Sequence, residues 1–264
     1  MGLAFTHEEP MANMMRNFIS SYKDLPIYPY DVRTVFRNES RAKSGVMRGR
    51  EFFWKALYSF SKNEEEHNEF YEKSKEAYLN VYKRVGLGEL TYITFASGGT
   101  FSKYSHEFQT LSDAGEDIIY IDKSKNIAIN KEVYNDEVIA DLGLSKIDLV
   151  EEKAIEVGNI FSLGHKFSEP FDVKYKDAEG KDNLVFMGSY GIGISRLLGT
   201  IAEVSNDDNG IIWPEEVAPF KVHLINIGNE DKTQEIYENL QEKGIDVLWD
   251  DRDKRPGELS LIHI

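Results

Sequence analysis

The feature of this sequence that most limits its possible folds is a glycine-rich stretch at residues 183–203. It begins with apolar residues typical of a strand, continues through Gly188, Gly191 and Gly193, and ends in an amphipathic helix with Arg196 in its first turn. Glycines permit a turn with positive φ or a close approach of the backbone to another group. Because a helix N-terminus has free N–H groups, the turn and the arginine together predict an anion-binding site.

The spacing of these glycines argues against the two common nucleotide-binding loops. Gly-x-x-Gly-x-Gly is the reverse of the dinucleotide fingerprint, and no strand ending in an acidic residue follows about 20 residues later. The chain also has no Gly-Lys-Ser or Gly-Lys-Thr, which a P-loop requires.

A second informative stretch predicts an antiparallel hairpin, with strands at residues 32–39 and 47–60 joined by a basic loop. Alternation puts Arg37 and Glu39 on one face of the first strand, and Arg48, Arg50 and Phe52 on one face of the second. Such a surface suits a nucleoside triphosphate, with arginines on phosphates, Glu39 accepting from the adenine amine and Phe52 stacking on the base. A salt-bridged hairpin surface without a ligand is the alternative.

The charge distribution favours a local anionic ligand over a general polyanion partner. The net charge is −15, although residues 1–50 carry eight basic and five acidic side chains. No apolar run is long enough to cross a membrane, and the absence of cysteine is compatible with a cytoplasmic protein.

Periodicity predicts an α+β protein in which an antiparallel sheet flanked by helices is followed by the start of an α/β unit. A methionine-rich helix is expected at 6–22, and a second helix from a Ser61/Glu64 capping box to Gly86. Further strands are expected at 91–96, 106–111, 118–121, 155–163 and 184–187, with 123–152 as an excursion from the sheet. After a linker at 213–220, residues 222–227, 232–243 and 245–249 indicate strand, helix and strand, with a domain boundary near Pro219.

Metal-binding residues cannot be assigned from spacing, because the six histidines are dispersed. His106 and Glu107 form a polar pair within an expected strand, as His7 and Glu8 do near the N-terminus, and such pairs are usually structural. Mg²⁺ bound to phosphates needs only one or two carboxylates and stays possible.

Motif order identifies a resemblance that covers nearly the whole chain. The blocks are Thr6-His-Glu-Glu9, Phe36-Arg37-Asn38-Glu39 with Arg48-Gly-Arg-Glu-Phe52, Ser105-His-Glu-Phe108, Gly115-Glu-Asp117, Glu156-Val-Gly-Asn-Ile-Phe161, Met187 to Arg196, Gly210-Ile-Ile-Trp-Pro214 and Ala218-Pro-Phe220. Together they resemble the bacterial-type prolyl-tRNA synthetases, a family of class II aminoacyl-tRNA synthetases. The pair of segments at 36–39 and 48–52 is similar to class II motif 2, and residues 187–196 are similar to motif 3.

The resemblance implies proline–tRNA ligase activity, in which L-proline reacts with ATP to form prolyl-adenylate and the prolyl group then passes to the 3′ end of tRNA(Pro). On the proline side it implies that Thr6 and Glu8 hold the imino group. It also implies that His106, Glu107 and Ser189 line the pocket for proline and the adenylate.

On the nucleotide side the resemblance implies that Arg37 bridges the proline carboxylate and the α-phosphate. Glu39 and Phe52 would hold adenine, and Arg48 and Arg196 would bind the terminal phosphates with Mg²⁺. Arg37 and Arg196 are then the expected catalytic residues, acting by positioning and charge neutralisation.

Several departures from the family pattern affect these expectations. Ala56 replaces an acid, Ser189 a cysteine and Asn159 a histidine. Residues 118–155 are a short remnant where the bacterial family has a large editing insertion, so we expect no deacylation of Ala-tRNA in cis.

The expected domains are a catalytic core at 1–218 and a partial anticodon-binding domain at 219–264, with both ends incomplete. Motif 1 is not found, and residues 259–264, which follow Arg255-Pro-Gly-Glu258, are unlike the family. A full-length protein is expected to be a cytoplasmic homodimer with no membrane association. The alternatives are an inactive fragment or synthetase-like protein that binds ATP and proline without aminoacylation, and an unrelated nucleotide-binding module.

Overall fold

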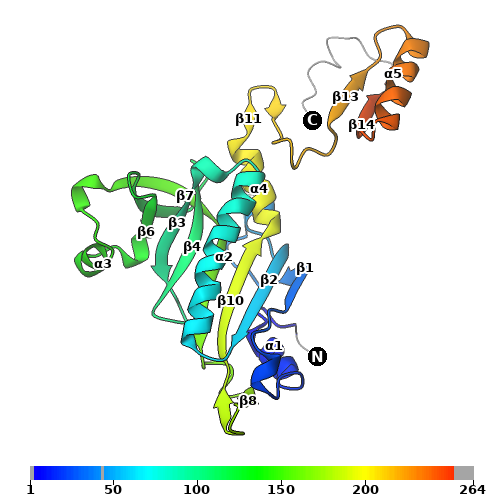
Figure 1. Ribbon diagram of the computed structural model, residues 1–264. Coiled ribbons are helices and arrows are strands. Elements are labelled where there is room, and N and C mark those ends of the chain that lie inside the picture. The colour runs from blue at the N-terminus through cyan, green and yellow to red at the C-terminus, as the bar shows by residue number, and fades with distance from the viewer. Residues whose placement is uncertain (1–2, 43–44, 253–264) are drawn as a thin grey trace.

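The computed structural model describes residues 3–42 and 45–252, and its centre is an eight-stranded sheet (Figure 1). The strand order is β1-β2-β10-β7-β4-β3-β6-β5, and only the β3–β6 pair is parallel. The strands are β1 (Tyr30–Phe36), β2 (Glu51–Ser61), β3 (Thr91–Ser97), β4 (Tyr104–Leu111), β5 (Asp117–Asp122), β6 (Ile127–Asn130), β7 (Val150–Gly164) and β10 (Phe186–Gly193). The predicted α+β class with an antiparallel core sheet is confirmed.

The β1–β2 hairpin is present, with Tyr30 opposite Leu57 and Phe36 opposite Glu51. Both strands are shorter than expected at the end joined by the loop, because the ladder stops after the Arg37 N–H donates to the Arg50 carbonyl at 2.9 Å. Strand alternation therefore does not place Arg37 and Glu39, or Arg48 and Arg50, on common faces.

The expected turn at the glycines is wrong, since Gly188 and Gly191 are interior residues of β10 and Gly193 ends it. Glycine is needed at these positions because other side chains lie close to the backbone, not because the backbone has a positive φ. A Cβ atom on Gly191 would lie 2.1 Å from the Trp54 ring, and one on Gly188 would lie 2.6 Å from the His67 ring. The helix α4 (Ile194–Val204) follows at once, with Arg196 in its first turn as expected.

Helix α2 (Glu64–Arg84) lies across one face of the sheet, which we call the helix face (Figure 1). Asn63, not the expected Ser61, caps it, because its side chain accepts from the Glu66 N–H at 2.9 Å. The helix ends as expected at Gly86, whose φ is +83°. Its buried stripe consists of His67, Tyr71, Ser74, Tyr78 and Tyr82. The tyrosines pack on Phe108, Val157, Ile160 and Tyr190.

Helix α1 (Glu8–Met15) packs on the opposite face, which we call the trough face. It is shorter than the expected helix, and its apolar stripe is only partly buried. Ala12, Met15 and Ile19 join Ala56, Tyr58 and Phe60 of β2 in a core cluster, whereas Met14 and Phe18 are 45% and 65% exposed.

Residues 123–152 are less separate from the sheet than expected. They supply all of β6 and the start of β7, and β5 pairs with both β6 and β7. A short helix, α3 (Asp136–Asp141), buries Val138 and Ile139 with Leu144 against Ile129, while Ile147 is 90% exposed.

Beyond α4, the predicted strand, helix and strand are present as β13 (Val222–Ile225), α5 (Glu230–Glu242) and β14 (Val247–Asp250), and the two strands pair in parallel. The remaining strands form two hairpins, β8 (Lys174–Lys176) with β9 (Asp182–Leu184) and β11 (Asn206–Asp207) with β12 (Gly210–Ile211). The expectations for residues 255–258 and 259–264 lie outside the described residues. Over residues 3–42 and 45–252, no helix is both long and apolar enough to cross a membrane.

Candidate active site

Three adjoining hollows form a trough on the trough face. We name each by a residue that it does not share, as the Glu8, Phe52 and Asp117 hollows. The Glu8 and Phe52 hollows share Arg37, Trp54 and Asn159 in their walls. The Phe52 and Asp117 hollows share Met47, Arg48, Glu156 and Arg196. A ligand could therefore extend from one hollow into the next.

The Glu8 hollow has a buried carboxylate at its base. Glu8 is 4% exposed, and its carboxylate accepts hydrogen bonds from the hydroxyls of Ser189, at 3.1 Å, and Thr6. Tyr58, directly opposite Ser189 on the neighbouring strand, also bonds to Glu8, and burial raises the pKa of Tyr58 far above its usual value. A buried anion surrounded by hydroxyls is suited to a small cationic group.

Aromatic side chains form the remaining walls of the Glu8 hollow. Trp54 and Tyr58 come from β2 and Phe161 from β7, while Phe101 comes from the β3–β4 loop. The Phe101 and Phe161 ring centroids are 5.1 Å apart. The hollow therefore combines a carboxylate with apolar walls and would hold a compact ligand that is cationic at one end.

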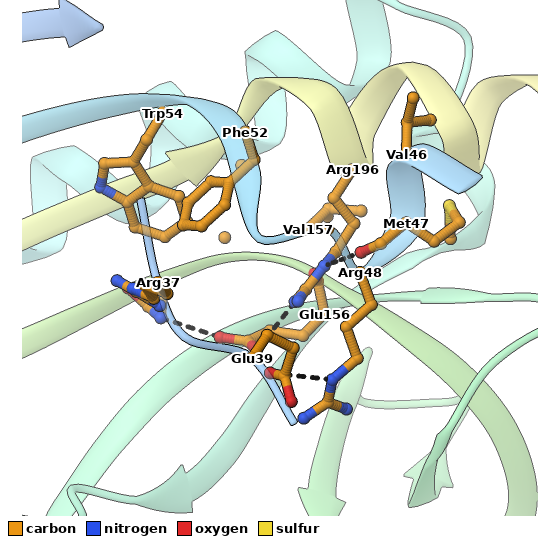
Figure 2. Close-up of a pocket in the computed structure, with 14 residues that line it drawn as sticks. Arg37, Glu39, Val46, Met47, Arg48, Phe52, Trp54, Glu156, Val157 and Arg196 are labelled. Carbon is orange, nitrogen blue, oxygen red and sulfur yellow. Dashed lines mark hydrogen bonds and ion pairs between the residues drawn. The ribbon is translucent and has the colours of Figure 1, made fainter. Parts of the chain in front are cut away.

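In the Phe52 hollow, Arg37 lies beside the rings of Phe52 and Trp54 (Figure 2). Its guanidinium carbon is 5.2 Å from the centroid of Phe52 and 5.7 Å from that of Trp54. Its Nε donates to the Phe5 carbonyl at 3.0 Å. Burial lowers the pKa of Arg37 from its usual value, and the negative charges of Glu156 and Glu8 oppose this change. Arg37 thus supplies a positive charge between the two hollows.

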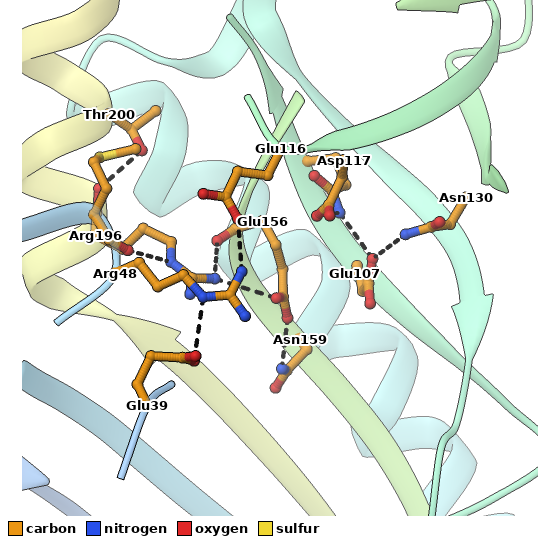
Figure 3. A network of polar contacts seen from close by, with 12 residues as sticks. Glu39, Arg48, Glu107, Glu116, Asp117, Asn130, Glu156, Asn159, Arg196 and Thr200 are labelled. Carbon is orange, nitrogen blue, oxygen red and sulfur yellow. Dashed lines mark hydrogen bonds and ion pairs between the residues drawn. The ribbon is translucent and has the colours of Figure 1, made fainter. Parts of the chain in front are cut away.

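Carboxylates hold the other two predicted phosphate-binding arginines (Figure 3). Arg48 pairs with Glu39 at 3.1 Å and with Glu116 at 2.6 Å. Arg196 pairs with the Glu156 carboxylate at 3.2 Å. An anionic ligand would have to compete with these carboxylates for Arg48, whereas Glu156 contacts the Arg196 side chain through Nη1.

Glu39 lines the Phe52 hollow, as predicted for an adenine contact, but its carboxylate already accepts hydrogen bonds within the protein. Besides Arg48 it accepts from the Arg41 backbone N–H at 2.8 Å, and this bond, followed by the Arg48 contacts, lowers the pKa of Glu39. An adenine amine would meet a carboxylate turned toward Arg48.

Glu156 and Asn159 both line the trough, although they are three residues apart and strict alternation would put them on opposite faces. Phe108 of β4 pairs with Gly158 of β7, but the next residue, Gln109, pairs with Glu156, so the register shifts by one residue between them. This bulge leaves Val157 unpaired and turns Glu156 to the same side as Asn159. The amide of Asn159 donates to Glu156 at 2.8 Å.

His106, which was expected to line the proline and adenylate pocket, is placed elsewhere. On β4 it points to the helix face, where its Nδ1 lies 2.9 Å from the Tyr71 hydroxyl of α2. Burial lowers the pKa of His106 to about 3, with a smaller contribution from Lys75. Because His106 and Glu107 are consecutive on a strand, only one of them can face the trough.

Glu107 is the one that faces the trough side, beside its wall and directly opposite Asn159 of β7. It accepts from Gln109 at 2.8 Å and Asn130 at 3.0 Å (Figure 3). Burial, helped by the charge of Glu156, raises the pKa of Glu107 to about 8. Glu107 is thus a supporting residue of this wall, not part of the hollows' lining.

Of the predicted site residues, Thr6, Glu8, Ser189, Arg37, Glu39, Arg48, Phe52 and Arg196 all line the trough. Sequence reasoning had not assigned a role to Trp54, Tyr58, Phe101 or Phe161. Alternation along β2 from Phe52 would have found Trp54 and Tyr58, but nothing local marks Phe101, which reaches the site from a loop.

The fold and the trough are those of a class II tRNA synthetase core, and a family model supports the same class. The chain belongs to the family described as the tRNA synthetase class II core domain (G, H, P, S and T), whose model matches residues 1–205.

Within this family, curated relatives that the chain resembles include proline–tRNA ligases. That of Rickettsia akari is 40% identical over 276 residues, with 98% of this chain and 64% of the relative covered. That of Rhodopseudomonas palustris is 37% identical, with 96% and 64% covered. The chain therefore spans somewhat under two thirds of the length of these relatives.

Solved structures show the same fold. The prolyl-tRNA synthetase of Cryptosporidium parvum, complexed with L-proline and AMP, matches with a TM-score of 0.73 at 20% identity, covering 98% of this chain and 48% of that one. The Giardia lamblia prolyl-tRNA synthetase in complex with prolyl-adenylate matches with a TM-score of 0.74 at 19% identity, covering 97% and 47%.

Proposed function

We propose that this chain carries the activity of a proline–tRNA ligase, forming prolyl-adenylate from L-proline and ATP and transferring the prolyl group to the 3′ end of tRNA(Pro). One observation carries the proposal. Arg37 stands in the wall common to the Glu8 and Phe52 hollows, so a carboxylate in the first and a phosphate in the second would meet on one guanidinium.

Proline fits the Glu8 hollow by its chemistry. Its secondary ammonium would be held by Glu8, which Thr6, Ser189 and Tyr58 surround with hydroxyls. Its apolar ring would lie against the aromatic walls, and its carboxylate would point to Arg37. The proline-bound relative structure supports this assignment.

ATP would extend from the Phe52 hollow into the Asp117 hollow. Adenine would stack on Phe52, where Arg37 and Trp54 also border the space, and the phosphates would run toward Arg48 and Arg196. The relative from Cryptosporidium parvum complexed with halofuginone and AMPPNP supports a nucleotide here. One proline carboxylate oxygen attacks the α-phosphorus, the new O–P bond forms, and the bond to the bridging oxygen breaks to release pyrophosphate.

Catalysis in this proposal rests on charge and position. Arg37 neutralises the attacking carboxylate and the α-phosphate together, and Arg48 and Arg196 stabilise the charge that develops on pyrophosphate. Because Arg48 is ion-paired in the free protein, binding exchanges a carboxylate for a phosphate at its guanidinium. Arg196 would keep its Nη1 contacts with Glu156 and offer Nη2 to the phosphates.

Mg²⁺ fits this arrangement as a phosphate-bound ion. The part of the chain that the structure describes has no cluster of three or more metal-ligating side chains, so the protein alone offers no complete cage. Glu116, Asp117 and Glu156 line the Asp117 hollow, and one or two carboxylates with phosphate oxygens and water satisfy Mg²⁺. The ion would neutralise the terminal phosphates.

The wider expectations belong to the same proposal. Residues 1–218 would form the catalytic core, with 118–155 in place of an editing insertion, and residues 219–264 part of an anticodon-binding domain. The full-length protein would act as a cytoplasmic homodimer. The class II core-domain model, which matches residues 1–205, supports the extent of the core.

Proline-dependent exchange of label between pyrophosphate and ATP tests the proposal. Exchange in the wild-type chain should need proline and fall at least a hundredfold in Arg37→Ala. Arg84→Ala is the matched control, since Arg84 is 75% exposed and pairs with Glu216 away from the trough. Binding of ATP and proline without exchange would support the alternative of a binding protein.

A further inference from the structure

Asn159 occupies a point in the trough where the two substrate hollows meet. Its side chain lines both the Glu8 and the Phe52 hollows, a property that only Arg37 and Trp54 share among the residues lining them. Unlike those two, it is small, neutral and able both to donate and to accept a hydrogen bond. Among the described residues its side chain makes one hydrogen bond, and that bond shows what Asn159 holds in place.

That contact is the hydrogen bond from Asn159 Nδ2 to Glu156 Oε1, 2.8 Å long. The other carboxylate oxygen, Oε2, accepts from Arg196 Nη1 at 3.2 Å. The amide thus fixes the rotation of the Glu156 carboxylate and leaves Oε2 directed at the arginine (Figure 3).

Arg196 is held at two further points. Its Nη1 also donates to the Glu156 carbonyl, and its Nε donates to the Met47 carbonyl, each at 3.0 Å. The backbone contacts place the guanidinium, whereas the Glu156 carboxylate is the one partner that can rotate away. The bond from Asn159 therefore decides whether this partner stays in place.

The backbone geometry around Asn159 serves the same arrangement. The bulge at Val157 brings Glu156 to the side of Asn159, and Gly158 between them lies beneath Tyr82, whose hydroxyl would be 2.3 Å from a Cβ atom there. Glu107 lies directly opposite Asn159 on β4, so an acidic side chain at position 159 would face two carboxyl groups. A neutral donor is the side chain that this position requires.

We infer that Asn159 is a positioning residue for the nucleotide. It acts through Glu156 to hold Arg196 in the orientation that receives the terminal phosphates, and it does not itself bind ATP. The inference rests on the proposed function of the trough, and it predicts that loss of the Asn159 amide weakens ATP binding more than proline binding.

The test combines exchange kinetics with equilibrium binding of AMPPNP to the purified chain. Asn159→Ala should raise KM for ATP and Kd for AMPPNP about tenfold, the effect of one lost charge-assisted hydrogen bond. KM for proline should change less than threefold. Asn159→His, whose ring N–H can donate to the same carboxylate, should restore most of the ATP affinity, and Asn159→Asp should not.

A cycle with Glu156→Gln separates positioning from general damage. In that background Asn159→Ala should have little further effect on AMPPNP binding, because the carboxylate that it positions is gone. Additive effects, or equal rises in both KM values, would overturn the inference.

The proposed ligase function and the positioning role of Asn159 are contradicted by different results. A wild-type chain that binds AMPPNP without proline-dependent exchange contradicts the proposed function, and the Kd values still test Asn159. Unchanged AMPPNP affinity in Asn159→Ala contradicts the positioning role alone, whereas no binding of AMPPNP by the wild type contradicts both.

Discussion

Replacing Glu8 by Gln removes the negative charge at the base of the Glu8 hollow while keeping the size of the side chain. In the structure this carboxylate is 4% exposed and accepts from Ser189 and Thr6, and the proposed proline ammonium would bind to it directly. A hydrogen bond to a charged group contributes about 1.5–3 kcal/mol, which corresponds to roughly a 10- to 150-fold loss of affinity.

The assay is pyrophosphate exchange at varied proline and saturating ATP. Glu8→Gln should raise KM for proline by that factor and leave KM for ATP within about twofold. Glu9→Gln is the matched control, because Glu9 is its exposed neighbour in the first turn of α1. A change in KM for proline below threefold, with thermal unfolding unaltered, would refute the assignment of Glu8 as the ammonium's partner.

Three further predictions concern charge, packing and pH. Arg48→Ala should raise KM for ATP about tenfold and leave KM for proline within twofold in the same assay, and equal changes in both would contradict its placement on phosphates. Gly191→Ala should lower the free energy of unfolding in urea by about 1–3 kcal/mol, since its Cβ would lie 2.1 Å from the Trp54 ring, whereas Gly193→Ala, with 3.4 Å of space, should cost less than half as much. Burial lowers the pKa of Lys55 from 10.5 to about 8, so the unfolded chain binds that proton more tightly and wild-type stability should rise relative to Lys55→Met as the pH increases from 8 to 10; a constant difference in urea unfolding would contradict this.

The sequence correctly predicted those elements that are specified by residues close together in the chain. The hairpin of β1 and β2, the helix that ends at Gly86 and the parallel β13–α5–β14 unit all followed from alternation, glycine placement and helical periodicity. Each of these signals is local because hydrogen-bonding partners lie close in sequence or the chain must reverse at a defined residue.

The errors arose where tertiary contacts decide the conformation. The glycines of β10 looked like a turn, but Trp54 and His67 from other elements require their lack of a side chain. The buried stripe of α2 is made mainly of tyrosines and His67, because these rings pack against sheet residues that lie far away in the sequence.

The structure brings most of the predicted site residues together, and it separates one pair at a strand face. Arg37, Arg48 and Arg196 come from segments far apart in sequence and meet in one trough. His106 was assigned to that trough although Glu107 next to it was too, and a strand cannot turn both side chains inward. Glu156 and Asn159 reach one face only through a bulge, which no periodicity reveals.

The central claim is that one guanidinium joins an amino-acid site to a nucleotide site, and trapping the product tests it most directly. Mixing the chain with proline, ATP and Mg²⁺ without tRNA, then measuring the protein-bound small molecules by mass spectrometry, should yield prolyl-adenylate near one per active site. Arg37→Ala should yield almost none while still binding AMPPNP. Wild-type protein that retains only unreacted ATP and proline, or an Arg37→Ala variant that accumulates prolyl-adenylate normally, would contradict the account.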